Sequence, residues 1–174
     1  GLVSLTGTTV ANALNITSGG TLTLGASDRI GSSTNVLLDA GQLALGNYNN
    51  TVGGFTLQNG ASLNGSGKLT TGVYDLRGGV VVANLGSGTV SVTIGTTNLN
   101  GTADALLVNV GSGSLALGGV NRLASGATVN VSGGVLDTAT YANAINAFNL
   151  SGGMVTGTGV LTASTYALSG GVVA

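Results

Sequence analysis

The chain alternates apolar and polar residues in short runs of about three to six residues. Examples are Leu22-Thr23-Leu24, Val90-Ser91-Val92-Thr93-Ile94 and Val129-Asn130-Val131. A period of two with Leu and β-branched residues is typical of β-strands that bury one face. Ser-Gly-Gly, Asn-Gly and Gly-Thr-Gly sequences between the runs indicate turns. The pattern therefore predicts about twenty short strands, spaced by about eight residues, and gives little support for helices.

The sequence repeats itself at an offset of about 93 residues. At this offset several residues coincide with a residue of the same type: Arg29 with Arg122, Gly41 with Gly134, Tyr48 with Tyr141, Phe55 with Phe148 and Leu57 with Leu150. One residue is then lost, and at an offset of about 92 Tyr74 coincides with Tyr166. We therefore predict a single segment, 1–174, that contains two tandem units at approximately 1–83 and 84–174.

The two units are cut at an arbitrary phase of the repeat. Residues 3–9 are similar to residues 89–97, so Ala174 is expected to end about where Gly1 begins. No charged and apolar leader follows Gly1, and we expect the chain to be a mature or excised piece. Two alternatives stay open, a complete chain that polymerises and a part of a longer array with further repeats.

The repeat decides between the folds that many short strands allow. A closed sandwich or barrel has no reason to repeat at this period. A right-handed parallel β-helix with coils of about 18 to 25 residues would hold four or five coils in each unit of about 93 residues. We therefore predict an all-β, right-handed parallel β-helix, or β-solenoid, of about seven to nine coils and about 35 to 45 Å in length.

The composition agrees with a narrow interior built from small side chains. The chain has 33 glycines and no proline, and only 3% of its residues are aromatic while 43% are hydrophobic. Leu, Val, Ile and Ala can stack coil above coil, glycine can occupy corners with positive φ, and proline would remove a donor from a strand ladder. Outward Thr, Ser and Asn side chains can hydrogen-bond to their neighbours along the rod.

Charge and residue types exclude several functional classes. Four basic and five acidic residues give a net charge of −1, which is too little positive charge for a nucleic-acid partner. A chain that is this hydrophobic and this weakly charged is not expected to be disordered. No apolar run approaches the roughly 18 residues of a transmembrane helix. Without Cys and His there are no disulfides, no thiolate or imidazole metal ligands and no proton shuttle near neutral pH.

Two Gly-rich segments carry a family resemblance. Residues 86–95 read Gly-Ser-Gly-Thr-Val-Ser-Val-Thr-Ile-Gly, and residues 107–118 read Leu-Val-Asn-Val-Gly-Ser-Gly-Ser-Leu-Ala-Leu-Gly; residues 121–123 and 127–137 continue the pattern. These segments resemble the passenger-associated β-strand repeats of bacterial autotransporters. The resemblance implies a surface-exposed or secreted β-solenoid stalk or adhesin. It also implies export through an outer-membrane β-barrel translocator, which is not within these residues.

Carboxylates are the first candidates for catalysis, since β-helices also include glycan-processing enzymes. Glycoside hydrolysis usually needs two carboxyl groups about 5 to 9.5 Å apart. All five acids of the chain are isolated in the sequence: Asp28, Asp39, Asp75, Asp104 and Asp137. The counterparts of Asp28, Asp39, Asp75 and Asp137 in the other unit are not acidic, so the unit does not repeat an acidic site. We therefore predict no enzyme activity, no catalytic residue, no cofactor and no metal site.

The repeated polar and aromatic residues are the candidates for surface contacts. Arg29 and Arg122 are the only charged residues repeated in register. We expect each side chain to lie along the rod with its guanidinium on backbone carbonyls, and contact with a surface glycan is the alternative. Tyr48 and Tyr141 are expected to stack between coils, with a sugar platform as the alternative. Stacked or core positions are also expected for the other repeated aromatic residues: Phe55, Phe148, Tyr74 and Tyr166.

Three functions from different classes follow from these observations. The first is a structural and adhesive segment of a bacterial surface-exposed or secreted fibre, which mediates cell-surface adhesion, aggregation or formation of a biofilm matrix. The second is a self-polymerising subunit that joins head to tail into an extracellular filament. The third is a glycan-processing β-helix. The expected partners are neighbouring repeats or like chains end to end, and surface glycans.

Overall fold

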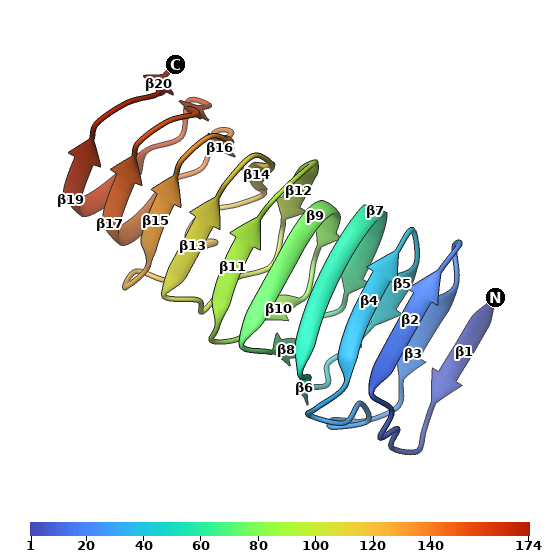
Figure 1. Cartoon of the computed structure of the whole chain (residues 1–174). Coiled ribbons are helices and arrows are strands. Elements are labelled where there is room, and N and C mark those ends of the chain that lie inside the picture. The colour runs from blue at the N-terminus through green and yellow to red at the C-terminus, as the bar shows by residue number, and fades with distance from the viewer.

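The computed structural model describes all residues 1–174 and contains twenty β-strands and no helix, as the alternation predicted. Figure 1 shows an elongated rod with the N-terminus at one end and the C-terminus at the other. There is no helix long and apolar enough to cross a membrane. The strands are β1 (Leu2–Leu5), β2 (Ala13–Thr17), β3 (Thr21–Leu24), β4 (Asn35–Asp39), β5 (Gln42–Ala44), β6 (Asn50–Thr51), β7 (Gly54–Asn64), β8 (Lys68–Thr70), β9 (Val73–Val81), β10 (Asn84–Leu85), β11 (Thr89–Val92), β12 (Thr96–Leu99), β13 (Leu107–Val110), β14 (Ser114–Leu117), β15 (Thr128–Val131), β16 (Val135–Asp137), β17 (Asn143–Leu150), β18 (Met154–Thr156), β19 (Leu161–Leu168) and β20 (Val172–Val173).

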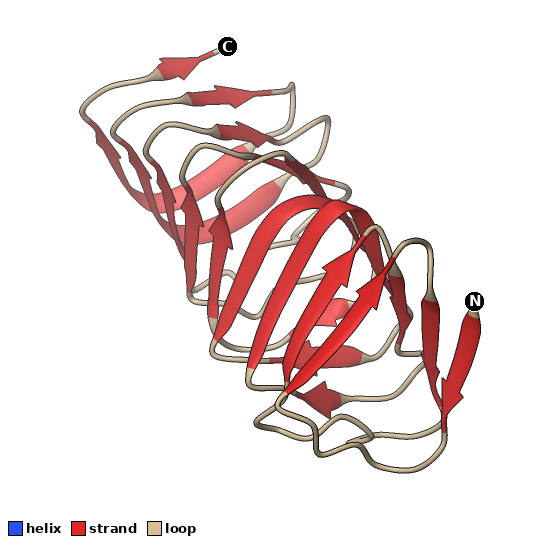
Figure 2. Ribbon diagram, turned by 45° about the vertical axis from the view of Figure 1, so that its right-hand side comes forward, coloured by secondary structure: helices blue, strands red, loops and turns tan.

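The strands form three faces along the rod, and every pair of strands is parallel (Figure 2). Face A consists of β2, β4, the first halves of β7 and β9, β11, β13, β15 and the second halves of β17 and β19. Face B consists of β1, β3, β5, the second halves of β7 and β9, β12, β14, β16, β18 and β20. Face C holds β6, β8 and β10 and continues as isolated bridges. The predicted parallel β-helix is confirmed.

Successive coils stack in register, which gives columns of equivalent residues. One inward column of face A runs through nine coils: Leu14, Val36, Phe55, Tyr74, Val90, Val108, Val129, Phe148 and Tyr166. Five coil steps lead from Val36 to Val129, which are 93 positions apart, so five coils correspond to one period of the repeat. Coil lengths run from 16 residues, Tyr74 to Val90, to 22 residues, Leu14 to Val36. The shortest coil is shorter than predicted because only residues 82–88 carry the chain around face C.

One continuous core of 37 buried hydrophobic residues runs through the rod. Alternate residues of faces A and B point inward, so the strand period places Leu and Val side chains inside. Phe55 and Phe148 are each 2% exposed, which confirms their predicted core positions. The coils approach closely at some corners, where a Cβ on Gly67 would overlap the carbonyl oxygen of Tyr48. Glycine is therefore required at that corner for steric reasons.

The structure places the first strand on face B. β1 pairs with β3 in the same register in which β12 pairs with β14, so Gly1 occupies the position of Gly95. At the other end, the N–H of Ala174 donates to the carbonyl of Val155, and the N–H of Val82 donates to the carbonyl of Leu63 in the same way. Ala174 therefore occupies the position of Val82. Residues 83–94 therefore have no second copy, and the likeness of residues 3–9 to residues 89–97 reflects only the alternation shared by all strands.

Candidate functional site

The two repeated arginines lie where the chain enters face C. Arg29 directly precedes Ile30, which bridges to Thr9, and Arg122 directly precedes Leu123, which bridges to Ala103. Five coil steps separate the two arginines, which is about 24 Å at roughly 4.8 Å per coil. The structure therefore contains two separate arginine corners, and it does not bring the two guanidinium groups together.

A buried asparagine in the next coil holds the backbone of each arginine. The Oδ1 of Asn50 accepts a hydrogen bond from the N–H of Arg29 at 2.9 Å, and the Oδ1 of Asn143 accepts one from the N–H of Arg122 at 2.7 Å. Both asparagines are 2% exposed. These bonds give each buried amide oxygen a partner and so fix the corner, whereas the Nδ2 of Asn50 is buried without a partner. Sequence reasoning missed both asparagines, although they coincide at the repeat offset and a search for repeated polar residues would have found them.

The guanidinium groups do not lie on backbone carbonyls, so that prediction is wrong. The Nη1 of Arg29 reaches only the hydroxyl of Thr8, at 3.4 Å, and the Nε atoms of both Arg29 and Arg122 are buried without a hydrogen-bond partner. The carbonyls at these corners already accept hydrogen bonds from the neighbouring coil. Those of Arg29 and Arg122 accept from Thr9 and Ala103, each at 2.8 Å.

Neither repeated arginine has a carboxylate partner. The two salt bridges of the structure join Lys68 to Asp104 and Arg77 to Asp75. A guanidinium group presents five N–H donors in a planar fork and accepts no hydrogen bond. The terminal nitrogens at both corners can therefore donate to a carboxylate or to several hydroxyl groups of a ligand.

Tyr48 and Tyr141 lie in the coil that follows each arginine. Next to Tyr48, the carbonyl of Asn49 accepts a hydrogen bond from the N–H of Asp28 at 3.0 Å. Next to Tyr141, the carbonyl of Ala142 accepts one from the N–H of Asn121 at 2.9 Å. Tyr48 packs partly against the core, whereas Tyr141 is 36% exposed. The four candidate residues thus form two arginine–tyrosine corners, on neighbouring coils and without a direct bond between the two side chains.

The other repeated tyrosines stack on phenylalanines of the neighbouring coil. The ring of Tyr74 meets the ring of Phe55 edge to face with centroids 6.4 Å apart, and Tyr166 meets Phe148 in the same way at 6.2 Å. The hydroxyl of Tyr74 donates to the carbonyl of Leu69 at 2.8 Å. Burial raises the pKa of Tyr74 to about 12. Both tyrosines occupy stacked coil positions, as predicted.

The acidic residues are dispersed along the rod, and most of them bind a neighbour. No group of three or more His, Cys, Asp or Glu residues that could hold a metal ion occurs in the structure. Four carboxylates accept local hydrogen bonds: Asp39 from Asn59, Asp75 from Arg77 and Thr93, Asp104 from Lys68, and Asp137 from the N–H of Ala139. These contacts tie neighbouring coils and turns together.

An asparagine ladder runs along the outer side of face A. The Nδ2 of Asn149 donates to the Oδ1 of Asn130 at 2.7 Å, and the Nδ2 of Asn130 donates to the Oδ1 of Asn109 at 2.8 Å. The three residues occupy one column, which continues to Ser91 in the preceding coil. Side chains paired in this way stabilise neighbouring strands and give this part of the rod an uncharged outer strip.

The fold and these surfaces define a β-solenoid, a rod of stacked parallel coils with polar outer faces. Comparisons of the chain with protein-family models, with curated proteins and with solved structures gave no match. The arginine–tyrosine corners and the asparagine ladder are the surface features that bear on function.

Proposed function

We propose that the chain is a structural and adhesive segment of a bacterial surface-exposed or secreted β-helical fibre, which mediates adhesion, aggregation or matrix formation. The asparagine ladder on face A carries this proposal. Its three residues, Asn109, Asn130 and Asn149, repeat the same donor and acceptor pattern from coil to coil. A strip of this kind can make many weak contacts at once with a glycan or with a second rod, and linked weak contacts give strong overall binding.

The architecture and the sequence resemblance support the same proposal. Backbone pairing joins each coil to its neighbours, so a stalk of this type distributes its stability along its length. The likeness of residues 86–95 and 107–118 to autotransporter passenger repeats favours a location outside the cell. The arginine–tyrosine corners add hydrogen-bond donors that suit surface glycans.

Display of the chain on non-aggregating bacterial cells tests the adhesive function. We expect displayed cells to sediment as aggregates and to be retained on surfaces coated with glycans or with the purified chain. Asn130→Lys places a charge in the middle of the ladder, and we expect aggregation to fall several-fold. Ser112→Lys adds the same charge in the exposed turn between β13 and β14 and serves as the matched control. Cells that display the unmodified chain and neither aggregate nor adhere would contradict the proposal.

The arginine corners are tested separately from the ladder. In the double variant Arg29→Gln and Arg122→Gln, we expect retention on glycan-coated surfaces to fall, because two guanidinium groups without a carboxylate partner are lost. Aggregation of the same cells through the ladder should persist. Unchanged glycan retention would remove the corners from the binding surface.

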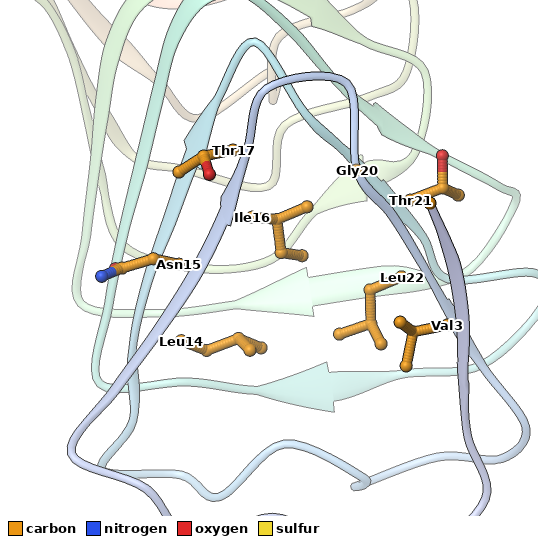
Figure 3. A pocket seen from close by; sticks show the side chains of 9 residues that line it. Val3, Leu14, Asn15, Ile16, Thr17, Gly20, Thr21 and Leu22 are labelled. Atoms are coloured by element: carbon orange, nitrogen blue, oxygen red, sulfur yellow. The ribbon is translucent and has the colours of Figure 1, made fainter.

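A second candidate function is a filament subunit that joins copies head to tail. The observation that favours it is the common parallel register in which like coils stack, which a coil of a second copy can continue. Figure 3 shows the first coils of the stack, where Val3, Leu14, Ile16 and Leu22 among others line a hollow. Sedimentation velocity over a range of concentrations tests it, since a filament subunit gives a growing series of species. A single monomeric species at every concentration would contradict self-polymerisation.

A further inference from the structure

Arg122 is the only cationic side chain of the protein that donates no hydrogen bond. Lys68 and Arg77 bind carboxylates, and Arg29 reaches the hydroxyl of Thr8. The Nε of Arg122 is buried without a partner, whereas its two terminal nitrogens are not buried. Arg122 lies between β14 and β15, with stacked coils on both sides. Its terminal N–H groups therefore reach the side of the rod with their hydrogen-bonding capacity unused.

The corner around Arg122 holds the guanidinium in place without using these terminal groups. A Cβ on Gly119 would overlap the guanidinium, so the guanidinium lies against the backbone of this glycine. The Oδ1 of Asn143 accepts from the backbone N–H of Arg122 at 2.7 Å, and its Nδ2 donates to the carbonyl of Gly119 at 3.4 Å. A donor that is positioned in advance loses less conformational entropy when a ligand binds.

Neutral hydrogen-bonding side chains flank the guanidinium. Asn121 directly precedes Arg122 and is exposed, and Tyr141 in the following coil is 36% exposed. The carbonyl of Ala142, next to Tyr141, accepts from the N–H of Asn121 at 2.9 Å, so both side chains belong to one corner. The amide and the phenol can exchange hydrogen bonds with the hydroxyl groups of a sugar, and the tyrosine ring can pack against an apolar sugar face.

No carboxylate of the chain occupies the Arg122 corner. Asp104 in the preceding coil is paired with Lys68, and the Oδ1 of Asp137 accepts from the N–H of Ala139 at 2.7 Å. A single guanidinium with neutral neighbours matches the single charge of a carboxylate, which its planar fork can bind with two parallel hydrogen bonds. Phosphate groups carry about −1.5 to −2 charges and are recognised by clusters of arginines, which this corner lacks.

The first corner differs from the second by one charge. Asp28 is the counterpart of Asn121, and the two residues have φ angles of 54° and 50°, so they adopt the same left-handed turn. Asp28 is also the one acid that accepts no hydrogen bond and forms no ion pair. Adjacent Cα atoms are about 3.8 Å apart, so its carboxylate lowers the positive potential around Arg29. The chain thus contains one cationic corner and a near copy whose charge is offset.

We propose that the Arg122 corner binds the carboxylate of an acidic sugar in a surface glycan, and that the residue before each arginine sets which corner binds. The two carboxylate oxygens accept from the guanidinium fork, and Asn121 and Tyr141 contact the hydroxyl groups of the same sugar. This inference rests on the glycan contact proposed above for the arginine–tyrosine corners and names the class of ligand.

The arginine signals of the full chain provide a site-resolved test. The three arginines, Arg29, Arg77 and Arg122, each give one Nε–H signal in a proton–nitrogen NMR spectrum. We expect a tetramer of glucuronic acid to shift the Arg122 signal saturably. The Arg29 signal should require about threefold more ligand, the effect of one unit charge at roughly 7 Å in water. The Arg77 signal should not move, because its Nε–H donates to Asp75 at 2.8 Å. The tetramer of glucose with the same linkages is the matched ligand without carboxylates and should shift none of the three.

Exchanging the residue before each arginine tests the specificity. Asp28→Asn should raise the affinity at Arg29 about threefold, and Asn121→Asp should lower the affinity at Arg122 by a similar factor. Each variant places in one corner the residue that the other corner already holds in the same left-handed turn, so the fold is retained. Circular dichroism checks this. Affinities that do not respond to the exchange overturn the proposed specificity.

Variants of the arginines separate this inference from the adhesive function. In Arg122→Gln, the backbone amide signals of Asn121 and Tyr141 should no longer respond to the glucuronic acid tetramer. Arg77→Gln is the matched control and should leave the response of Arg122 unchanged. Absence of a saturable shift at Arg122, or an equal response to the glucose tetramer, overturns the proposal. If displayed cells still aggregate through the asparagine ladder in that case, the adhesive function stands and only the acidic ligand is refuted.

Discussion

The coil around Tyr74 and the coil around Tyr166 have the same aromatic pair and the same hydroxyl hydrogen bonds, yet one is closed and the other is open. In the first, Tyr74 and Leu76 are covered by β11 and have no exposed surface. In the second, the counterparts Tyr166 and Leu168 lie at the end of the rod and are more than half exposed. Burial in a solenoid is therefore supplied by the next coil and is not determined by the coil's own residues.

The two coils also differ in charge. Asp75 binds Arg77 across the outer side of β9, and Lys68 in the same coil binds Asp104. The counterparts of Asp75, Arg77 and Lys68 are Ala167, Ser169 and Val160, which form no ion pair. The closed coil thus combines full burial with two ion pairs, and substitutions can separate these contributions.

Replacing each of the two tyrosines by alanine should give the largest difference in the free energy of unfolding. Tyr74→Ala removes a fully buried ring and its hydroxyl contacts, and we expect the free energy of unfolding to fall by about 3–5 kcal/mol. Tyr166→Ala removes a ring that is half exposed, and we expect a loss of about 1 kcal/mol or less. Urea unfolding followed by circular dichroism measures both. Equal losses would show that burial by the next coil is not the main source of stability.

Alkaline pH should affect the closed coil through its tyrosine. Burial raises the pKa of Tyr74 from 10.0 to about 12. The unfolded chain loses this proton near pH 10 while the folded chain keeps it, so the contribution is complete below pH 10 and is lost as pH rises towards 12. The free energy of unfolding should fall by about 2–3 kcal/mol over this interval.

The phenylalanine variants are the controls for this pH dependence. Tyr74→Phe removes the titrating hydroxyl, so the corresponding loss between pH 10 and pH 12 should disappear in urea unfolding series. The same variant leaves the carbonyl of Leu69 without its donor, which lowers stability at neutral pH by about 1–3 kcal/mol. Tyr166→Phe keeps Tyr74 and should keep the loss at high pH. If Tyr74→Phe still loses the same free energy of unfolding between pH 10 and pH 12, groups other than Tyr74 cause the loss.

The alternation of apolar and polar residues was sufficient to predict the strands, and the repeat was sufficient to predict the parallel solenoid. Alternation does not specify a face, because inward and outward positions follow the same period on faces A and B. The face of β1 therefore follows only from its pairing with β3. The arginine corners were mispredicted for a related reason, since the carbonyls near Arg29 and Arg122 are already engaged by the ladder. Partners across coils depend on a register that loop lengths set, and local sequence does not show it.

The ion pair of the closed coil should have the smallest effect. The Nζ of Lys68 lies 2.5 Å from the Oδ2 of Asp104, two coil steps away on face C, and the side chains are 43% and 50% exposed. Exposed ion pairs are screened by water, so a double-mutant cycle with Lys68→Met and Asp104→Asn should give a coupling of about 0.2–1 kcal/mol. In 1 M salt the coupling should vanish, because the Debye length is then about 3 Å. A larger coupling that persists in salt would mean that the pair stabilises the stacking of three coils. The coil around Tyr74 would then differ in stability from the coil around Tyr166 through charge as well as through burial.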